Sequence, residues 1–308
     1  MMTSSPTEEA PEGSPAPDEG PRQTTPFLVL QFFIFPMAIV AACVAVFVIF
    51  GLISSDAKTA RDHLADVRRG GGMFGVKRWQ AAFAFAGALE SDKGRDAAKR
   101  DPELVKETVA LFEESKEDDP RVRRYLALAL GRMRHPAGVP ALLAVVRDPA
   151  SEQDAETLIH SILALGAIGD PGAVPELVRL LAHQDAGLRK AAAHALGSFD
   201  TAEARAALTR ALEDPVADVR WNAALVLARR REPAAAPVVA QMLDRSQLST
   251  VPGLTPEQAD DAVLQAVAAA AALGDPSLRP LLERLRDSDP NLKVREAARL
   301  ALEGRTQV

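Results

Sequence analysis

The stretch DAGLRKAAAHALG, residues 185–197, decides the fold, because variants of it recur along the chain. The other copies are DPRVRRYLALALG at 119–131, DPVADVRWNAALVLA at 214–228 and DPNLKVREAARLALEG at 289–304. Each copy has an apolar residue directly before a shared arginine. Counted from that apolar residue, the positions three, four, seven and eight residues later are also apolar, and Asn222 is the only polar exception. This spacing is the apolar stripe of an amphipathic helix. A helix that recurs every few tens of residues predicts an all-α fold, an α-solenoid of stacked helix pairs.

Composition agrees with closely packed helices. Apolar residues make up 47% of the 308 residues but aromatic residues only 5%, so Ala, Leu and Val must fill the core. The net charge is −6; residues 1–26 account for −4 of it and residues 27–53 are uncharged, which leaves −2 for the rest. A nearly neutral solenoid lacks the clustered Lys and Arg that nucleic-acid binding requires, so no nucleic-acid partner is expected.

The first 53 residues have two different compositions. Residues 1–26 are rich in Pro, Ser, Glu and Gly, and this acidic tail is predicted to be disordered. Residues 27–53 form an uncharged apolar run of 27 residues, longer than the roughly 20 residues that a bilayer core requires. The run predicts one transmembrane helix, since its acidic flank and its length do not fit a cleaved signal peptide.

The orientation of this helix follows from the basic residues around it. Arg22 stands before the run, whereas Lys58, Arg61, Arg68, Arg69, Lys77 and Arg78 follow it. Lys and Arg are retained on the cytoplasmic side. The sequence therefore predicts a single-pass protein of the cell membrane with its solenoid in the cytoplasm and its N-terminal tail outside.

Four segments are expected: the disordered tail 1–26, the transmembrane helix 27–53, a juxtamembrane helix with a glycine hinge over 54–75, and the solenoid over 76–308. The hinge is predicted at Gly70–Gly72, which follows the helix expected over 56–69. The expected solenoid pairs are 76–90 with 102–116, 120–133 with 137–147, 154–168 with 172–183, 186–198 with 201–213, 216–230 with 233–244, and 257–273 with 276–287, closed by a single helix over 291–304.

Two dipeptides set the expected boundaries. Asp-Pro recurs seven times. The Asp side chain can accept a hydrogen bond from a backbone N–H of the first helical turn. Pro suits the first helical position because a backbone N–H there would have no partner within the helix, and Pro has no N–H. Gly131, Gly166, Gly197 and Gly274 each follow a leucine, where a left-handed residue that ends a helix is expected.

The repeated pattern resembles HEAT repeats of the phycobilisome-lyase-like type. The best matches are residues 165–181, LGAIGDPGAVPELVRLL, together with 185–197 and 289–302, and the resemblance covers about residues 76–304. It implies a HEAT solenoid; for function it allows a protein-binding scaffold, a bilin lyase or a di-iron hydroxylase. The whole layout also resembles the single-span, membrane-anchored HEAT-repeat proteins of bacteria.

The sequence offers little that could perform catalysis. The hydroxylase branch would require His-Glu dipeptides on several helices, and none of the five histidines is followed by Glu. Cys43 lies in the apolar run, so no cysteine is available to a soluble histidine partner. No Gly-x-Ser-x-Gly motif and no phosphate-binding glycine loop is present. We therefore expect no enzyme, no catalytic, cofactor-binding or metal-ligating residues, no cofactor and no small-molecule substrate. A lyase-like or metal-dependent enzyme is the alternative.

A protein partner is the remaining expectation. The side chains opposite the apolar stripe of each second helix are predicted to line the concave groove, among them Glu176, Arg179, Arg210 and Gln241, alongside the apolar Ala141, Ala207 and Val238. The arginines after each stripe's first residue (Arg123, Arg189, Arg220 and Arg295) are expected to pair with acids of neighbouring repeats. The connection over 245–257 is unusually long and is a second candidate for binding. The sequence thus predicts a membrane-anchored, non-catalytic scaffold that recruits a protein through its solenoid.

Overall fold

The computed structural model describes residues 37, 39–46, 58–72, 76–148 and 154–304. The chain forms two compact units, Met1–Ala57 and Lys58–Val308, which are described separately. In the first unit residues 39–46 are helical, and the apolar side chains described there are exposed. Over the part of the chain that the structure describes, no helix has both the length and the apolar character needed to cross a bilayer. Most of 27–53 and all of the tail 1–26 lie outside the described residues, so both predictions remain predictions.

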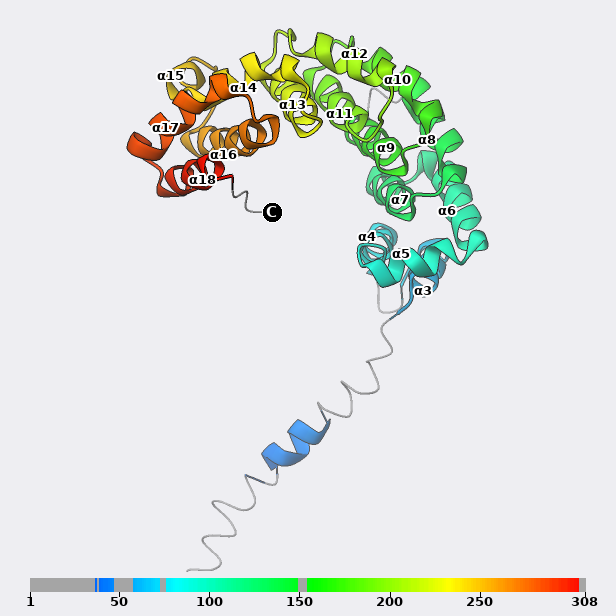
Figure 1. Cartoon of the computed structure of the whole chain (residues 1–308). Coiled ribbons are helices and arrows are strands. Elements are labelled where there is room, and N and C mark those ends of the chain that lie inside the picture. The colour runs from blue at the N-terminus through cyan, green and yellow to red at the C-terminus, as the bar shows by residue number, and fades with distance from the viewer. Residues whose placement is uncertain (1–36, 38, 47–57, 73–75, 149–153, 305–308) are drawn as a thin grey trace, which may run out of the picture. The chain divides into compact units, whose positions relative to one another are not determined.

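The second unit is a curved stack of helices in two layers (Figure 1). The inner layer contains α4 (Arg78–Ala88), α7 (Pro120–Met133), α9 (Ala155–Ile168), α11 (Ala186–Leu196), α13 (Ala217–Arg229), α16 (Pro256–Leu273) and α18 (Leu292–Leu302). The outer layer contains α6 (Pro102–Glu114), α8 (Val139–Arg147), α10 (Val174–Leu180), α12 (Ala202–Ala211), α14 (Ala236–Leu243) and α17 (Arg279–Ser288). Apart from the two-residue strands described below, this confirms the predicted all-helical solenoid.

The recurring stripe forms the core between the layers. In α11, Leu188, Ala192, Ala195 and Leu196 are at most 2% exposed, and the equivalent residues of α7 and α13 are buried in the same way, apart from Tyr125 and Asn222, which are half-buried. Because the buried side chains are mostly Ala, Leu and Val, neighbouring helices can approach closely.

The Asp-Pro dipeptides mark helix starts in two ways. Asp101 and Asp119 are themselves N-caps and accept hydrogen bonds from the first turns of α6 and α7, as predicted. Asp214 and Asp289 stand two residues before the actual N-caps, Val216 and Asn291, and bond to the backbone N–H groups of those residues. At these two sites the dipeptide forms the turn that precedes the helix.

Two of the four glycines predicted to end helices lie inside helices instead. Only Gly274 is a left-handed cap, with φ +64°. Gly131 and Gly166 lie inside α7 and α9, where a Cβ would stand 2.9 Å from the Cα of Ala164 and 2.8 Å from the Cα of Ala195. The prediction is wrong there because the glycines allow close helix crossing and do not supply a positive φ. Gly197 caps α11 in a right-handed conformation.

The region before α4 also differs from the prediction. α3 (Ala60–Arg68) is not a free juxtamembrane helix: Leu64 and Val67 are buried, and the compact unit begins at Lys58 instead of residue 76. Gly71–Gly72 (β1) pairs in antiparallel register with Val76–Lys77 (β2), so two of the hinge glycines are hydrogen-bonded to the chain that follows.

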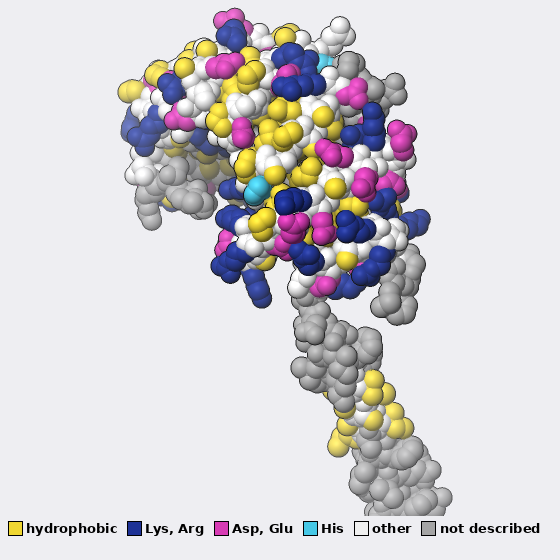
Figure 2. Space-filling view, turned by 90° about the vertical axis from the view of Figure 1, so that its right-hand side faces the viewer, with side chains coloured by type: hydrophobic (Ala, Val, Ile, Leu, Met, Phe, Trp, Pro, Cys, Tyr) yellow, Lys and Arg dark blue, Asp and Glu magenta, His cyan; other side chains and the backbone are white. Residues whose placement is uncertain are grey.

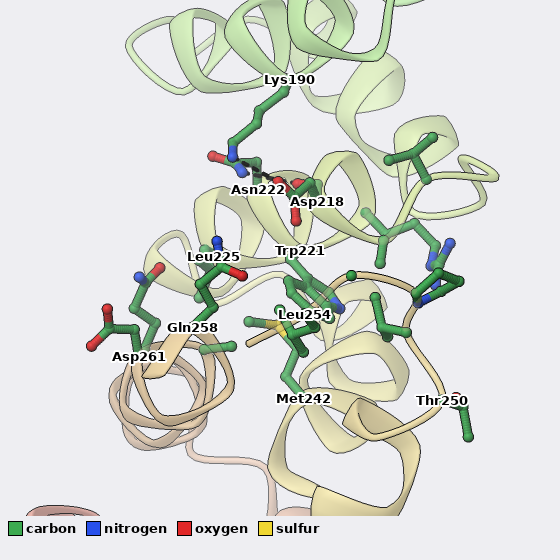
Figure 3. A pocket seen from close by; sticks show the side chains of 18 of the residues that line it. Lys190, Asp218, Trp221, Asn222, Leu225, Met242, Thr250, Leu254, Gln258 and Asp261 are labelled. Atoms are coloured by element: carbon green, nitrogen blue, oxygen red, sulfur yellow. Dashed lines mark hydrogen bonds and ion pairs between the residues drawn. The ribbon is translucent and has the colours of Figure 1, made fainter. Parts of the chain in front are cut away.

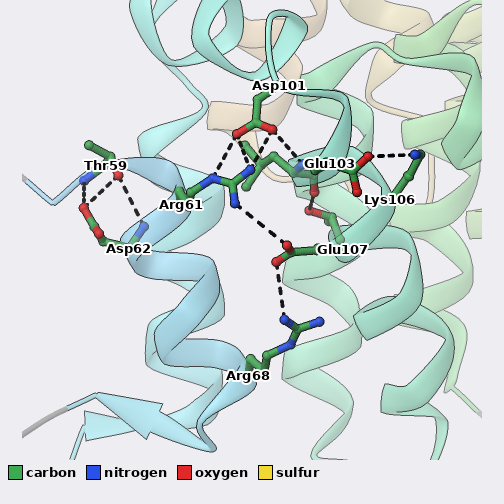
Figure 4. Close-up of polar contacts among 10 residues, drawn as sticks. Thr59, Arg61, Asp62, Arg68, Asp101, Glu103, Lys106 and Glu107 are labelled. Atoms are coloured by element: carbon green, nitrogen blue, oxygen red, sulfur yellow. Dashed lines mark hydrogen bonds and ion pairs between the residues drawn. The ribbon is translucent and has the colours of Figure 1, made fainter.

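Ion pairs hold α3 against the first outer helix (Figure 4). The Arg61 guanidinium donates to both carboxylate oxygens of Asp101, at 2.7 and 2.6 Å from Nη2, and Glu107 lies 3.6 Å from Arg68. A capping box between Thr59 and Asp62 begins α3. α3 therefore covers the N-terminal end of the stack.

Two short helices lie in connections between the predicted helices. α5 (Asp92–Lys99) begins at Ser91, whose side chain accepts from the backbone N–H of Gly94. α15 (Arg245–Leu248) begins at Asp244 in the long connection before α16. Both helices contain too few apolar residues to show a buried stripe in the sequence.

Candidate functional site

The four predicted groove residues do not lie in the concave groove. Glu176 and Arg179 are on α10 and Arg210 is on α12, and both helices belong to the outer layer (Figure 1). Gln241 is half-buried on α14, another outer helix. The prediction placed the second helix of each pair on the wrong side, because the stripe alone shows which face of a helix is buried but not which layer curves inward.

Ion pairs organise this outer surface. Glu176 lies 2.8 Å from both Arg147 and Arg179, and the two arginines lower the pKa of its carboxyl group, Arg179 more strongly. The apolar residues predicted beside them, Ala141, Ala207 and Val238, are 4%, 1% and 6% exposed and belong to the core. Exposed pairs of this kind contribute little to stability. The hollow beside Arg210, lined by Val178, Leu181 and Ala207, has a volume of only about 240 Å³.

A more suitable site lies between α13 and α16, where the chain leaves a hollow of about 840 Å³ (Figure 3). We call it the large hollow. α11, α13, α14, α16 and the connection 249–255 all contribute to its walls. Residues of the long connection form part of its wall, beside the inner helices α13 and α16.

The floor of the large hollow is apolar. Trp221 of α13 is 8% exposed and Met242 of α14 is 1% exposed, and both line the hollow. Leu225 and Leu254 are half-buried and complete the apolar surface from α13 and from the connection. Large side chains that are partly accessible in a concavity are the usual centre of a protein-binding site.

The rim of the large hollow is polar, and its formal charges balance, because Lys190 and Arg220 are matched by Asp218 and Asp261. Lys190 and Asp218 form an ion pair of 2.8 Å, and the Asn222 side chain donates to the Asp218 carbonyl oxygen at 2.9 Å. Gln258 and Gln265 add side-chain amides from α16. Amides both donate and accept hydrogen bonds, which matches an uncharged polypeptide backbone.

A buried ion cluster fixes the connection that closes the large hollow. Arg245 of α15 donates to both carboxylate oxygens of Asp289, at 2.7 and 2.8 Å, and the Asp289 side chain is fully buried. Arg245 also pairs with Asp260, which accepts from Asn291 at 2.6 Å. The hydrogen bond from Asn291 and then the one from Arg245 lower the pKa of Asp260. α15 is thereby joined to the starts of both α16 and α18.

One predicted arginine pair is confirmed. Arg189 donates to both carboxylate oxygens of Asp214 in the next repeat, at 2.7 and 3.0 Å. Arg220 instead donates to the Asp214 and Pro215 carbonyl oxygens, and the Arg123 guanidinium lies over the ring of Phe112, 5.2 Å from its centroid. Arg189 therefore reaches the next repeat, whereas Arg220 binds the loop before its own helix and Arg123 packs on the preceding helix α6.

The sequence contained two signals for the large hollow. Asn222 is the polar exception in the apolar stripe, and it stands on the rim. The 245–257 connection, the second predicted binding candidate, supplies Thr250, Val251 and Leu254 to the lining. The pattern could not show that these two features, more than twenty residues apart, meet in one place.

Other kinds of site find less support. Within the described ranges, no three or more His, Cys, Asp or Glu side chains are grouped as metal ligands. On the face drawn in Figure 2, Lys and Arg side chains are interspersed with Asp and Glu, and no broad basic area is visible. A phosphate backbone would find no continuous positive track on that face.

The comparisons with known proteins agree with this fold. The family model for HEAT repeats matches residues 108–196, 150–218 and 180–253. The protein is a HEAT-like solenoid. No curated protein sequence matches the chain.

Solved structures with similar folds share little sequence with this HEAT-like chain. The complex of CpcE and CpcF of phycocyanin lyase from Nostoc is 18% identical, with a TM-score of 0.51 over 80% of this chain and 88% of that one. YibA of Escherichia coli is 20% identical, with a TM-score of 0.46 over 79% and 82%. Human deoxyhypusine hydroxylase is 19% identical, with a TM-score of 0.33 over 80% and 95%. At these identities the Nostoc structure supports the fold alone.

Proposed function

We propose that the protein is a non-catalytic scaffold that holds a segment of a partner protein in the large hollow. The observation that carries this proposal is the combination of an apolar floor, formed around Trp221, Leu225 and Leu254, with a rim of amides and an internally paired Lys190 and Asp218. A rim whose formal charges balance favours an uncharged, extended polypeptide over a strongly ionic ligand. HEAT repeats commonly mediate protein interactions, and the Nostoc neighbour is itself a complex of two chains.

We further propose that residues 27–53 anchor this scaffold in the cell membrane, with the solenoid in the cytoplasm. The support is the uncharged run of 27 residues and the exposure of its helical apolar side chains at 39–46. Exposed apolar residues of this kind are unfavourable in water and favourable in a bilayer. The full chain should resist alkaline extraction from membranes, whereas a variant without 27–53 should be released. Release of both proteins would remove the anchor from the proposal.

Site-specific photo-crosslinking tests the binding site. A photo-reactive residue at position 225, inside the large hollow, should give a discrete crosslinked partner in native membranes. The same residue at position 210, on the outer layer, should give none. Crosslinking from 210 alone would return the site to the outer face, where Glu176, Arg179, Arg210 and Gln241 lie.

Matched variants measure the affinity. Leu225→Arg places a charge in the apolar floor and should weaken partner binding at least tenfold, as expected for a central contact. The double variant Arg179→Glu with Arg210→Glu should bind as the wild type does. A thermal melt of each variant shows whether the fold is kept. Equal binding by the wild type and a folded Leu225→Arg variant would contradict the assignment.

A further inference from the structure

A second, smaller hollow of about 250 Å³ lies between α7 and α9, beside α5. We call it the small hollow. It exists because Gly131, Ala164 and Ala167 have little or no side chain where the two inner helices cross. Leu128 and Leu163 form apolar walls, and Leu163 is 38% exposed although it is a large apolar residue. The volume is below the roughly 300–1,000 Å³ of small-molecule sites, so the small hollow suits a side chain better than a cofactor.

The rim of the small hollow is basic. Arg95, Arg132, Arg134 and His160 all line it. Arg95 pairs with Asp92, and Arg132 pairs with Glu90 at 3.3 Å and donates to the Ala86 carbonyl oxygen at 2.6 Å. Arg134 forms no ion pair and no side-chain hydrogen bond with another described residue, and it is exposed. One full positive charge at the mouth of this apolar hollow is therefore left uncompensated among the described residues.

The backbone at Arg134 gives an independent reason to expect a role for its side chain. Arg134 ends α7 in the left-handed conformation, with φ 50° and ψ 39°. At the corresponding ends of α9 and α16 the chain has Gly169 and Gly274, which adopt positive φ without steric strain. A residue with a Cβ is unfavourable at such a position, and strained residues that persist are concentrated at functional sites. Arg231, the other positive-φ arginine, lies after α13 and does not line the small hollow.

We propose that the small hollow is a second contact site for a polypeptide, which inserts one large apolar side chain between Leu128 and Leu163 and places an adjacent Asp or Glu carboxylate on Arg134. The proposal rests on the proposed function in one respect, that the protein binds polypeptides. Charge complementarity selects the occupant: an unpaired guanidinium favours an acid, because it binds a carboxylate through two parallel hydrogen bonds. The floor contributes apolar burial, and the charge selects for acidic segments.

Selection from a random peptide library tests this chemistry with the full-length protein. Peptides captured by the wild type should be enriched in an apolar residue next to Asp or Glu. A selected peptide and its Asn/Gln counterpart are then measured against the wild type, Arg134→Gly and Arg231→Gly. Loss of the acid should weaken wild-type binding about tenfold, which is the effect of losing one charged hydrogen-bonded pair. The same change should have almost no effect on binding to Arg134→Gly.

The two glycine variants separate a binding role from a structural one. Both remove a Cβ from a left-handed position, so both should melt at the wild-type temperature or a few degrees higher. Only Arg134→Gly should lose the preference for acidic peptides; Arg231→Gly is the matched control. If the selected peptides show no acidic preference, or if Arg134→Gly keeps it, the proposal is overturned.

A third variant tests the hollow itself. Ala167→Leu adds a side chain at an exposed position of its lining and should reduce peptide binding at least tenfold without changing the charge of the rim. Unchanged binding would place the peptide elsewhere. Leu225→Arg in the large hollow should leave binding of these peptides unchanged, so a failure of the proposed function and a failure of this site give different results.

Discussion

The two halves of the solenoid pack their inner helices differently. Between α7, α9 and α11, a glycine of one helix meets an alanine of the next, Gly131 with Ala164 and Gly166 with Ala195. The next crossing sets Gly197 against the larger Val226, and beyond α13 the connection 249–255 comes between helices. The first arrangement leaves a hollow of about 250 Å³ and the second a hollow of about 840 Å³.

This difference teaches that one repeated pattern can build both a rigid frame and a binding site. Where the small residues repeat, the helices close and leave the small hollow, which has room for a single side chain. Where they stop and the connection lengthens, apolar residues such as Leu225 and Leu254 remain partly accessible. The geometry of the large hollow therefore follows from a local departure from the repeat.

The largest expected effect is at the ion cluster that fixes the 249–255 connection. Arg245→Met leaves the fully buried Asp289 carboxylate without its cation and should destabilise the protein by about 3 kcal/mol. Urea unfolding measures the loss, and hydrogen exchange locates it. Amides of residues 245–255 should exchange faster than in the wild type, because α15 loses its attachment to α18.

Arg189→Met is the matched variant in the tightly packed half. The Arg189–Asp214 pair is also largely buried, so a loss of similar size is expected. The faster exchange should then appear around 183–189 and 214, and the 249–255 connection should keep its wild-type protection. If both variants loosen the same amides, the two halves unfold as one unit and the local account of the large hollow is wrong.

The sequence predicted the layered helices well because burial is periodic. α7 begins and ends at the predicted residues, since Asp119-Pro120 supplies its cap and the apolar stripe continues to Met133. The stripe could not show which layer curves inward, and this is why Glu176 and Arg179 were assigned to the wrong face. Curvature depends on the spacing of helices that are distant in sequence, and that spacing is set by contacts such as Gly166 with Ala195.

The next effect tests the close crossings directly. Gly166→Ala adds a Cβ 2.8 Å from the Cα of Ala195, a backbone atom that cannot move alone, so α9 and α11 must separate. Such overpacking should cost about 2 kcal/mol in urea unfolding, more than the gain in helix propensity. Gly87→Ala in α4 is the control: nothing lies within 4 Å of its added Cβ, so stability should rise by up to about 1 kcal/mol. Stabilisation at both positions would show that the crossing is looser than described.

The smallest effect is a pH dependence at Asp260, in the half with the large hollow. The hydrogen bond from Asn291 and the one from Arg245 place the pKa of Asp260 in the folded protein below its ordinary value of 3.8. Its stabilising contribution is therefore fully present above that value and is lost as the pH falls through the lowered pKa. At pH 6 the free energy of unfolding of the wild type should exceed that of Asp260→Asn by about 1 kcal/mol. The difference is this small because the Asp260 side chain is about one-third exposed. It should vanish in stronger acid. Unfolding curves for the two proteins at a series of pH values measure it. Since Asp260 joins α16 to α15 through Arg245, a difference that persists at low pH would mean that the carboxylate charge does not hold the connection, and that packing of the connection alone keeps the large hollow open.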